Sequence, residues 1–411
     1  MPTVDPPQPQ LRRGLLVVAI VLTGFSMRTA VTSIGSVLER LQDGLGATGA
    51  GAGLITTLPV LCFAAVGSFA PRLNRRFGPN RVLVVAMVAA TAGLATRALA
   101  GSLWLFALLS ILALTGGAIS NVSMPSLVKS YFPDRLGAMT AVYTTALAIG
   151  ATAAAGLTVP ISDLSSGADS WRLGIGSWAL FTAVAVLPWL PMVRRRDASS
   201  GPVRAIPVRA LIGSRTAWAL TIFFAFQSFQ AYIAFGWFAR FFEDHGVSDG
   251  GAGGLVAYYS ALSIPISMVV PALAVRGQRR IILSLGACYA VGYAGLIIAP
   301  VGGAWLWLIL IGIGSGAFPV ALTMIGLHTR HIEVTAAVSA FVQSVGYVLA
   351  GSGPLLVGAL IGATHSWTGP FIALYVALAV STGAGVIAAR DTTVDQEIES
   401  RRRSLAAQIS G

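Results

Sequence analysis

The chain has 411 residues, of which 55% are hydrophobic and 10% are charged, and its mean hydropathy is +0.78. About a quarter of the residues of a soluble protein are charged, so this composition excludes an ordinary soluble protein and indicates a multi-pass membrane protein. The formal net charge is +12, but the basic residues stand in short clusters between apolar runs, where they set membrane topology. We therefore expect a lipid bilayer around the chain and no nucleic-acid partner.

Apolar runs long enough to cross a bilayer recur along the whole chain and predict twelve membrane helices. They cover residues 14–38, 51–71, 81–100, 103–128, 137–160 and 174–193, and then 214–239, 253–275, 281–300, 303–327, 335–362 and 369–389. The first run is too long for a signal peptide and should stay as a membrane helix. The predicted parts are an N-terminal tail (1–13), a six-helix bundle (14–193), a linker (194–213), a second six-helix bundle (214–389) and a C-terminal tail (390–411).

The basic residues gather on one side of these spans. If the N-terminus is cytoplasmic, that side holds all but five of the 27 lysines and arginines; the exceptions are Arg28, Arg40, Arg97, Arg172 and Arg240. The positive-inside rule then predicts that both termini, the linker and the two tails are cytoplasmic, and that the protein lies in the cytoplasmic (inner) membrane.

The two halves of the chain resemble each other. Residues 120–148 align without a gap on residues 319–347, at an offset of 199. This repeat predicts an all-α integral membrane fold of two pseudo-symmetric six-helix bundles, with substrate bound near the midplane between them. The alternative is a chance similarity between two segments rich in glycine and alanine.

Arg28 lies in the middle of the first span. It follows Arg13 by 15 residues, which is about 22 Å along a helix at about 1.5 Å per residue and close to the centre of a hydrocarbon core. An arginine there costs about 2.5–3.5 kcal/mol on the mildest scale, so it marks a binding site or pathway by default. The repeat offset puts Gln227 at the same depth in the seventh span, and we expect the two side chains to face each other. The alternative is a structural charge that holds carbonyl groups at a gate.

Further polar and aromatic residues are expected around this charge. The predicted substrate contacts are Arg28, Gln227, Asn121, Thr144, Gln343, Tyr347, Tyr143 and Thr32. A guanidinium surrounded by neutral donors suits a small anion of carboxylate-like geometry. In the alternative interpretation, the neutral residues only bond to neighbouring helices or to their own carbonyls.

The spans have no acidic residue near their middle, so the usual intramembrane proton carrier is missing. Charged residues at the cytoplasmic ends are the candidates for a gate: Asp134, Arg135, Glu333, Arg72 and Arg76. The alternative is that these charges only hold the ends of helices.

Motifs for nucleotides and metals are absent. The sole lysine, Lys129, does not belong to a G-x-x-x-x-G-K-[ST] loop, and neither H-E-x-x-H nor paired C-x-x-C occurs. We therefore expect no cofactor, no metal and no ATP-driven pump. A membrane enzyme or a solute sensor remains an alternative from another class, although the first lacks a central acid or base and the second lacks an output domain.

Several of these motifs together resemble the major facilitator superfamily and, more closely, its bacterial cyanate and nitroimidazole permease family. They include Arg28 itself, Ala70-Pro71-Arg72-Leu73, Phe132-Pro133-Asp134-Arg135, Tyr143-Thr144-Thr145-Ala146-Leu147 and Gln343-Ser344-Val345-Gly346-Tyr347. Family members often carry Asn-Leu-Arg where this chain has Ser26-Met27-Arg28. The superfamily signature usually has an aspartate where Pro71-Arg72 stands, which counts against a drug/proton antiporter.

The function we predict is a secondary permease, not an enzyme, that moves a small polar anion by alternating access and works as a monomer. Arg28 is its central positive charge. The alternative that the family resemblance allows is an exporter of small neutral or weakly basic aromatic compounds of the nitroimidazole type.

Overall fold

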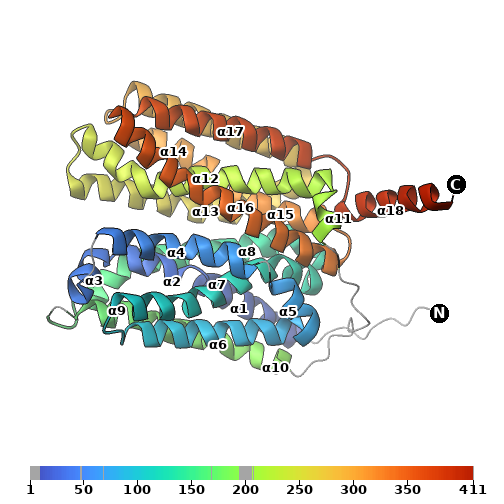
Figure 1. Cartoon of the computed structure of the whole chain (residues 1–411), viewed down its shortest axis with the longest axis horizontal. Helices are drawn as coiled ribbons and strands as arrows, with labels where there is room; N and C mark the ends of the chain where they lie inside the picture. The colour runs from blue at the N-terminus through green and yellow to red at the C-terminus, as the bar shows by residue number, and fades with distance from the viewer. Residues whose placement is uncertain are drawn as a thin grey trace.

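The computed structural model describes residues 10–46, 49–67, 69–167, 169–193, 206 and 208–410. In these residues the chain forms two layers of long helices that lie against each other (Figure 1). The first half of the chain makes one layer and the second half makes the other. Most of the expected linker, 194–213, lies outside the described residues.

The first layer contains the six spans expected for the first half. Its long helices are α1 (Gln10–Ser26) with α2 (Thr29–Gly35), α4 (Gly49–Gly67), α6 (Pro79–Arg97), α7 (Leu103–Tyr131), α8 (Leu136–Ser162) and α9 (Trp171–Val186). Short elements complete it: α3 (Leu38–Leu45), α5 (Ala70–Phe77), η1 (Pro133–Arg135), η2 (Leu187–Trp189) and α10 (Leu190–Val193).

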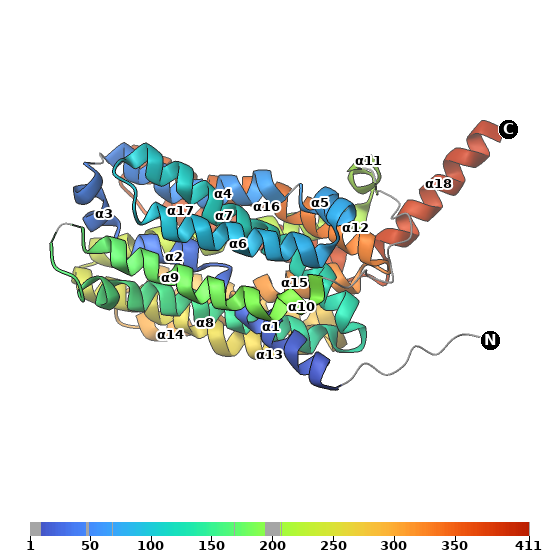
Figure 2. The same cartoon turned by 90° about the horizontal axis from the view of Figure 1, so that it is seen from below.

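The second layer contains the other six spans. Its helices are α12 (Arg215–Asp244), α13 (Asp249–Ile298), α14 (Ala304–Gly314), α15 (Ala317–Leu327), α16 (Ile332–Thr364) and α17 (Thr368–Ala388). The short α11 (Val208–Ile212) precedes them, and α18 (Val394–Ser410) follows and projects from one end (Figure 2).

The number of spans agrees with the sequence prediction. Ten helical segments of the described chain are long and apolar enough to cross a membrane. One of them, α13, contains two spans because Gly277 has non-helical backbone angles (φ −163°, ψ 58°) between its arms. With α4, a helix of 19 residues at the place of the second expected span, the twelve spans in two halves are confirmed.

The first span differs from the continuous helix that we expected. The α1 helix ends at Ser26 and α2 begins at Thr29, with Arg28 (φ −114°, ψ −4°) in the junction. Hydroxyl groups bond to carbonyls at the break: Thr29 donates to Ser26 at 3.0 Å and Thr32 donates to Arg28 at 3.1 Å. Such local bonds let a membrane helix break without leaving its backbone unsatisfied.

The α8 helix packs directly against the end of α1. A Cβ atom on Gly150 would clash with the carbonyl oxygen of Phe25, and one on Gly24 would lie 2.6 Å from the carbonyl oxygen of Tyr143. Small residues at such crossings let two membrane helices approach closely. The contact fixes the position of the α1 end, which lies two residues before Arg28.

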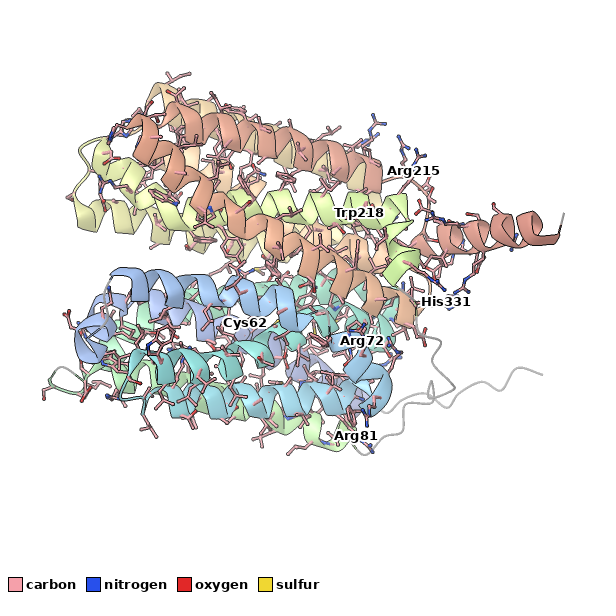
Figure 3. The ribbon with its side chains drawn as sticks, in the orientation of Figure 1. Cys62, Arg72, Arg81, Arg215, Trp218 and His331 are labelled. Carbon is pink, nitrogen blue, oxygen red and sulfur yellow. The ribbon has the colours of Figure 1, made fainter. Side chains whose placement is uncertain are left out.

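One end of the bundle collects basic side chains. Figure 3 shows Arg72, Arg81, Arg215 and His331 at the same end, from which α18 also projects (Figure 1). We call this the basic end, and the other, where α3 lies, the opposite end. The face of the membrane that each end meets stays a prediction from the charge distribution.

Candidate substrate site

Arg28 points from the first layer toward the second. Its side chain is half-buried, and its guanidinium carbon lies 5.1 Å from the ring centroid of Phe318 on α15. The guanidinium also interacts electrostatically with the hydroxyl groups of Tyr232 and Tyr347. No carboxylate pairs with Arg28 among the ion pairs of the described residues. The site therefore presents a positive charge without a negative partner.

Aromatic rings from both layers surround this charge. Tyr347 packs against Phe224 at 5.1 Å, Phe63 at 5.3 Å and Tyr232 at 6.5 Å between ring centroids. Phe224 also packs against Phe318 at 6.0 Å. A cation on an aromatic ring gains about 0.5–2 kcal/mol, less than the cost of about 2.5–3.5 kcal/mol for an arginine at membrane depth. The aromatic contacts thus compensate the charge of Arg28 only in part.

A hydrogen-bonded network crosses the two layers beside Tyr347. Asn121 on α7 donates from Nδ2 to the Tyr347 hydroxyl at 3.1 Å, and Gln343 donates from Nε2 to the Asn121 carbonyl at 3.4 Å and to Ser339 Oγ at 2.9 Å. Ser339 in turn donates to the Val122 carbonyl at 2.7 Å. Asn121 Oδ1 and Gln343 Oε1 are buried with no partner in this part of the chain. Buried acceptors without partners are rare and call for a ligand or a water molecule.

Gln227 is buried on α12, and its described contacts lie within its own helix. Its Nε2 donates to the Phe224 carbonyl at 3.1 Å and to Ser228 Oγ at 2.5 Å. The described partners of Arg28 across the layers are the ring of Phe318 and the hydroxyl groups of Tyr232 and Tyr347. A direct pair of Arg28 and Gln227 therefore stays a prediction.

The other three predicted substrate contacts are Thr144, Thr32 and Tyr143, and the structure places each in a different environment. Thr144 is buried and donates to the Thr140 carbonyl at 2.8 Å, which favours the alternative that it only bonds to its own helix. Thr32 is half-buried on α2, one turn after Arg28. Tyr143 is buried on α8, close enough to Tyr347 for the two hydroxyl groups to interact electrostatically.

The predicted gate residues lie at the basic end, mostly on the surface. Arg72 and Arg76 are exposed and lie over phenylalanine rings of their own segment, at 5.8 and 5.2 Å. Asp134 and Arg135 are exposed, and Glu333 is half-buried in the first turn of α16. In the described part of the chain no hydrogen bond or ion pair joins these five residues to the other layer.

Lys129, which is not among the predicted gate residues, makes a contact across the layers. At the end of α7, its Nζ donates to the Gly326 carbonyl at 2.7 Å, to the Thr329 carbonyl and to Thr329 Oγ1 at 3.3 Å. An open pocket of about 460 Å³ beside it is lined by residues of both layers, among them Asp134 and Arg276. The repeat gave a signal, because the offset of 199 places Lys129 opposite His328, next to Thr329.

Arg97 is a second functional candidate that the sequence prediction did not include. Its side chain is 0% exposed at the end of α6, and it donates to the Ala30 carbonyl at 2.9 Å and to Ser33 Oγ at 3.1 Å. Both acceptors belong to α2, so Arg97 fixes the helix that follows Arg28. Its signal in the sequence was its place among the five basic residues outside the expected cytoplasmic side.

Known proteins are similar to this chain in sequence and in fold. The family profile described as Major Facilitator Superfamily matches residues 20–354. The chain is 35% identical over 393 residues to the uncharacterized transporter YycB of Bacillus subtilis (strain 168), covering 94% of this chain and 96% of that protein. It is 31% identical over 386 residues to the 2-nitroimidazole transporter of Escherichia coli (strain K12), covering 93% and 97%.

A third relative and a solved structure extend the comparison. The cyanate transport protein CynX of Escherichia coli (strain K12) is 27% identical over 347 residues, which cover 84% of this chain and 89% of that protein. The proton:xylose symporter XylE bound to 6-bromo-6-deoxy-D-glucose superimposes with a TM-score of 0.76 over 94% of this chain and 98% of that chain, at 12% identity. The last likeness shows the fold alone.

Proposed function

Because the chain belongs to the major facilitator superfamily, we propose that it moves a small anion across the membrane by alternating access, with Arg28 holding the negative charge of the substrate. The observation that carries this proposal is the half-buried guanidinium of Arg28 at a helix break between the layers, without a carboxylate among its described partners. A desolvated cation gains most from an anion that shares its site. The negative charge that the site lacks is then supplied by the substrate.

Both discontinuous spans support a substrate position at this point. Arg28 lies in the break between α1 and α2, and Phe318 follows the break between α14 and α15. Transporters commonly bind their substrates where membrane helices are interrupted near the midplane. The two breaks come from different layers and meet at the Arg28–Phe318 contact.

The surroundings of Arg28 favour an anion with a planar apolar body. Phe318 and Tyr232 are half-exposed next to the charge, while Phe63, Phe224 and Tyr347 are buried behind them. Aromatic faces bind planar groups by offset or edge contacts. The expected substrate thus carries one negative charge on a planar group, which is no larger than a single aromatic ring.

The membrane arrangement is part of the same proposal. The basic end of the bundle faces the cytoplasm, in accordance with the positive-inside rule, and the protein works as a monomer in the bacterial cytoplasmic membrane. The predicted parts keep their bounds of 1–13, 14–193, 194–213, 214–389 and 390–411.

A second candidate function is the export of neutral or weakly basic aromatic compounds. The aromatic cluster around Tyr347 supports it, as does the relative whose printed name is 2-nitroimidazole transporter. In this case Arg28 would serve the protein's own conformational change and not the substrate.

The experiment that separates the two candidates is flux into proteoliposomes that contain the purified protein. Benzoate and benzamide share ring and size but differ in charge, and acetate keeps the charge without the ring. We expect benzoate to be transported and benzamide to be neither transported nor a competitor, with acetate weaker than benzoate. Transport of benzamide at the rate of benzoate would refute the anion proposal and favour the second candidate.

A further inference from the structure

The last helix of the chain is anchored to the basic end by two carboxylates. Asp395, only 4% exposed, accepts hydrogen bonds from the backbone N–H groups of Arg330 at 2.7 Å and His331 at 3.2 Å. Glu397 accepts from Ser214 Oγ at 2.5 Å and from the Thr216 hydroxyl at 2.9 Å, at the first turn of α12. The N-terminal turn of α18 is thus fixed to two elements of the second layer at the basic end, the start of α12 and the loop before α16.

The loop that Asp395 binds is the loop that Lys129 binds from the other layer. Lys129 donates hydrogen bonds to the carbonyl groups of Gly326 and Thr329. Asp395 accepts hydrogen bonds from the backbone N–H groups of the next two residues, Arg330 and His331. The loop is therefore held from both sides, by a cation on its acceptors and an anion on its donors. The two charges also attract each other electrostatically.

Further contacts show that this region joins the layers. A Cβ atom on Gly326 would lie 2.7 Å from the Leu136 side chain of α8, and Ser339 donates to the Val122 carbonyl of α7. The loop carries a third anchor to α18, because the N–H of Val394 donates to the His328 carbonyl at 2.9 Å. Opening the basic end would break the contacts of Lys129 while those of α18 stay within its own layer.

We propose that Asp395 and Glu397 are positioning residues for the Lys129 contact, so that α18 sets how firmly the basic end is closed. The Asp395 carboxylate binds the two backbone N–H groups that precede α16, and a negative charge at this position stabilises the start of the helix. It also keeps the neighbouring carbonyl group of Thr329 aimed at Lys129. Without it the loop is free to turn those carbonyls away. Lys129 then loses its acceptors although its own side chain is unchanged.

The proposal is tested by distances across the layers, measured with pulsed electron paramagnetic resonance in lipid nanodiscs. Spin labels replace Ser130 and Arg279 at the basic end, or Gly101 and Gly302 at the opposite end; all four positions are exposed. Cys62 and Cys288, the two native cysteines, are first changed to serine. Each end then reports its own opening.

We expect Asp395→Asn to raise the population with a long distance at the basic end about three- to tenfold, together with a shorter distance at the opposite end. Lys129→Gln should have the same effect, and the double variant should go no further than Lys129→Gln. Glu397→Gln, at the second anchor, should act in the same direction. Glu399→Gln is the matched control on the exposed side of α18. Its carboxylate pairs with Arg403 at 4.0 Å, and the substitution should change neither distance.

The reciprocal movement separates a positioning role from mere loss of stability, because a loosened bundle would broaden both distances. Unchanged distances in Asp395→Asn and Glu397→Gln would overturn the proposal. So would effects of Asp395→Asn and Lys129→Gln that add in the double variant, or an equal effect of Glu399→Gln.

Discussion

The substitution of Arg28 by glutamine is the sharpest perturbation of the proposed site. Glutamine keeps N–H donors and much of the length of the side chain but removes the charge. In the free protein the substitution removes a half-buried cation that lies over the ring of Phe318. Since that cation costs about 2.5–3.5 kcal/mol at membrane depth, we expect the thermal midpoint of the variant to stay the same or rise.

The expected loss of affinity follows from the contacts exchanged on binding. One or two charge-assisted hydrogen bonds to the anion are worth about 1.5–3 kcal/mol each, and the guanidinium gives up a cation–π contact of about 0.5–2 kcal/mol. With the middle of each range, the net loss for Arg28→Gln is about 1 kcal/mol for one bond and about 3 kcal/mol for two, which corresponds to about 5- to 150-fold weaker binding of benzoate.

The assay is isothermal titration calorimetry of benzoate into the purified protein, with Arg240→Gln as the matched control. Arg240 is exposed at the end of α12 and pairs with Asp244 at 2.8 Å, so its loss should change the affinity by less than twofold. An unchanged affinity in Arg28→Gln would refute the reasoning, and an equal loss in the control would show that the effect is not local.

Other side chains give three further predictions. Tyr347→Phe removes two contacts of the hydroxyl group across the layers, the hydrogen bond from Asn121 and the interaction with Arg28. It should shift the distance distribution at the basic end toward opening by at least about fivefold, because one hydrogen bond alone is worth about 1 kcal/mol. No shift would mean that the Tyr347 hydroxyl does not hold the layers together. Arg97→Ala leaves a void at a 0% exposed position and releases α2, so the protein should lose about 2–5 kcal/mol, seen as a thermal midpoint several degrees lower. Burial lowers the pKa of His328 below its ordinary value of 6.5, against the opposing effects of a backbone hydrogen bond and a nearby carboxylate. Its contribution to stability is then present above about pH 6.5 and lost as the pH falls through the lowered pKa, so His328→Gln should reduce the fall in thermal midpoint between pH 7.5 and 5, whereas the exposed His331→Gln should not.

The spans and their division into two halves were predictable because hydrophobic length and internal repetition are properties of the sequence itself. The break at Arg28 was not, because neither proline nor a run of glycines marks it. It depends on hydroxyl bonds of Thr29 and Thr32 to local carbonyls, and threonine makes such bonds inside intact helices as well.

The candidate site was predicted in part. The charge of Arg28 and the presence of Asn121 and Tyr347 beside it follow from polar residues at membrane depth, and the structure connects all three. The ring of Phe318 facing Arg28 was not foreseen, because an aromatic residue in an apolar helix carries no distinctive signal. The packing of the layers decides which rings turn inward.

The contacts at the basic end were predicted least well. The gate roles of Asp134 and Glu333 stay predictions, whereas Lys129 donates across the layers to backbone carbonyls. Every residue carries a carbonyl group, so sequence gives no sign of which one will be free and properly aimed. The same holds for the backbone donors that Asp395 binds.

The central claim is that the substrate brings one negative charge to Arg28. Electrical currents from proteoliposomes on a solid-supported membrane test it most directly, because a rapid jump of benzoate reports charge moved with the substrate. The account predicts a transient current of the sign of an entering anion, none with benzamide, and a strongly reduced one in Arg28→Gln. Equal flux of benzamide without a current, or a current that survives in Arg28→Gln at the same benzoate concentration, would contradict it.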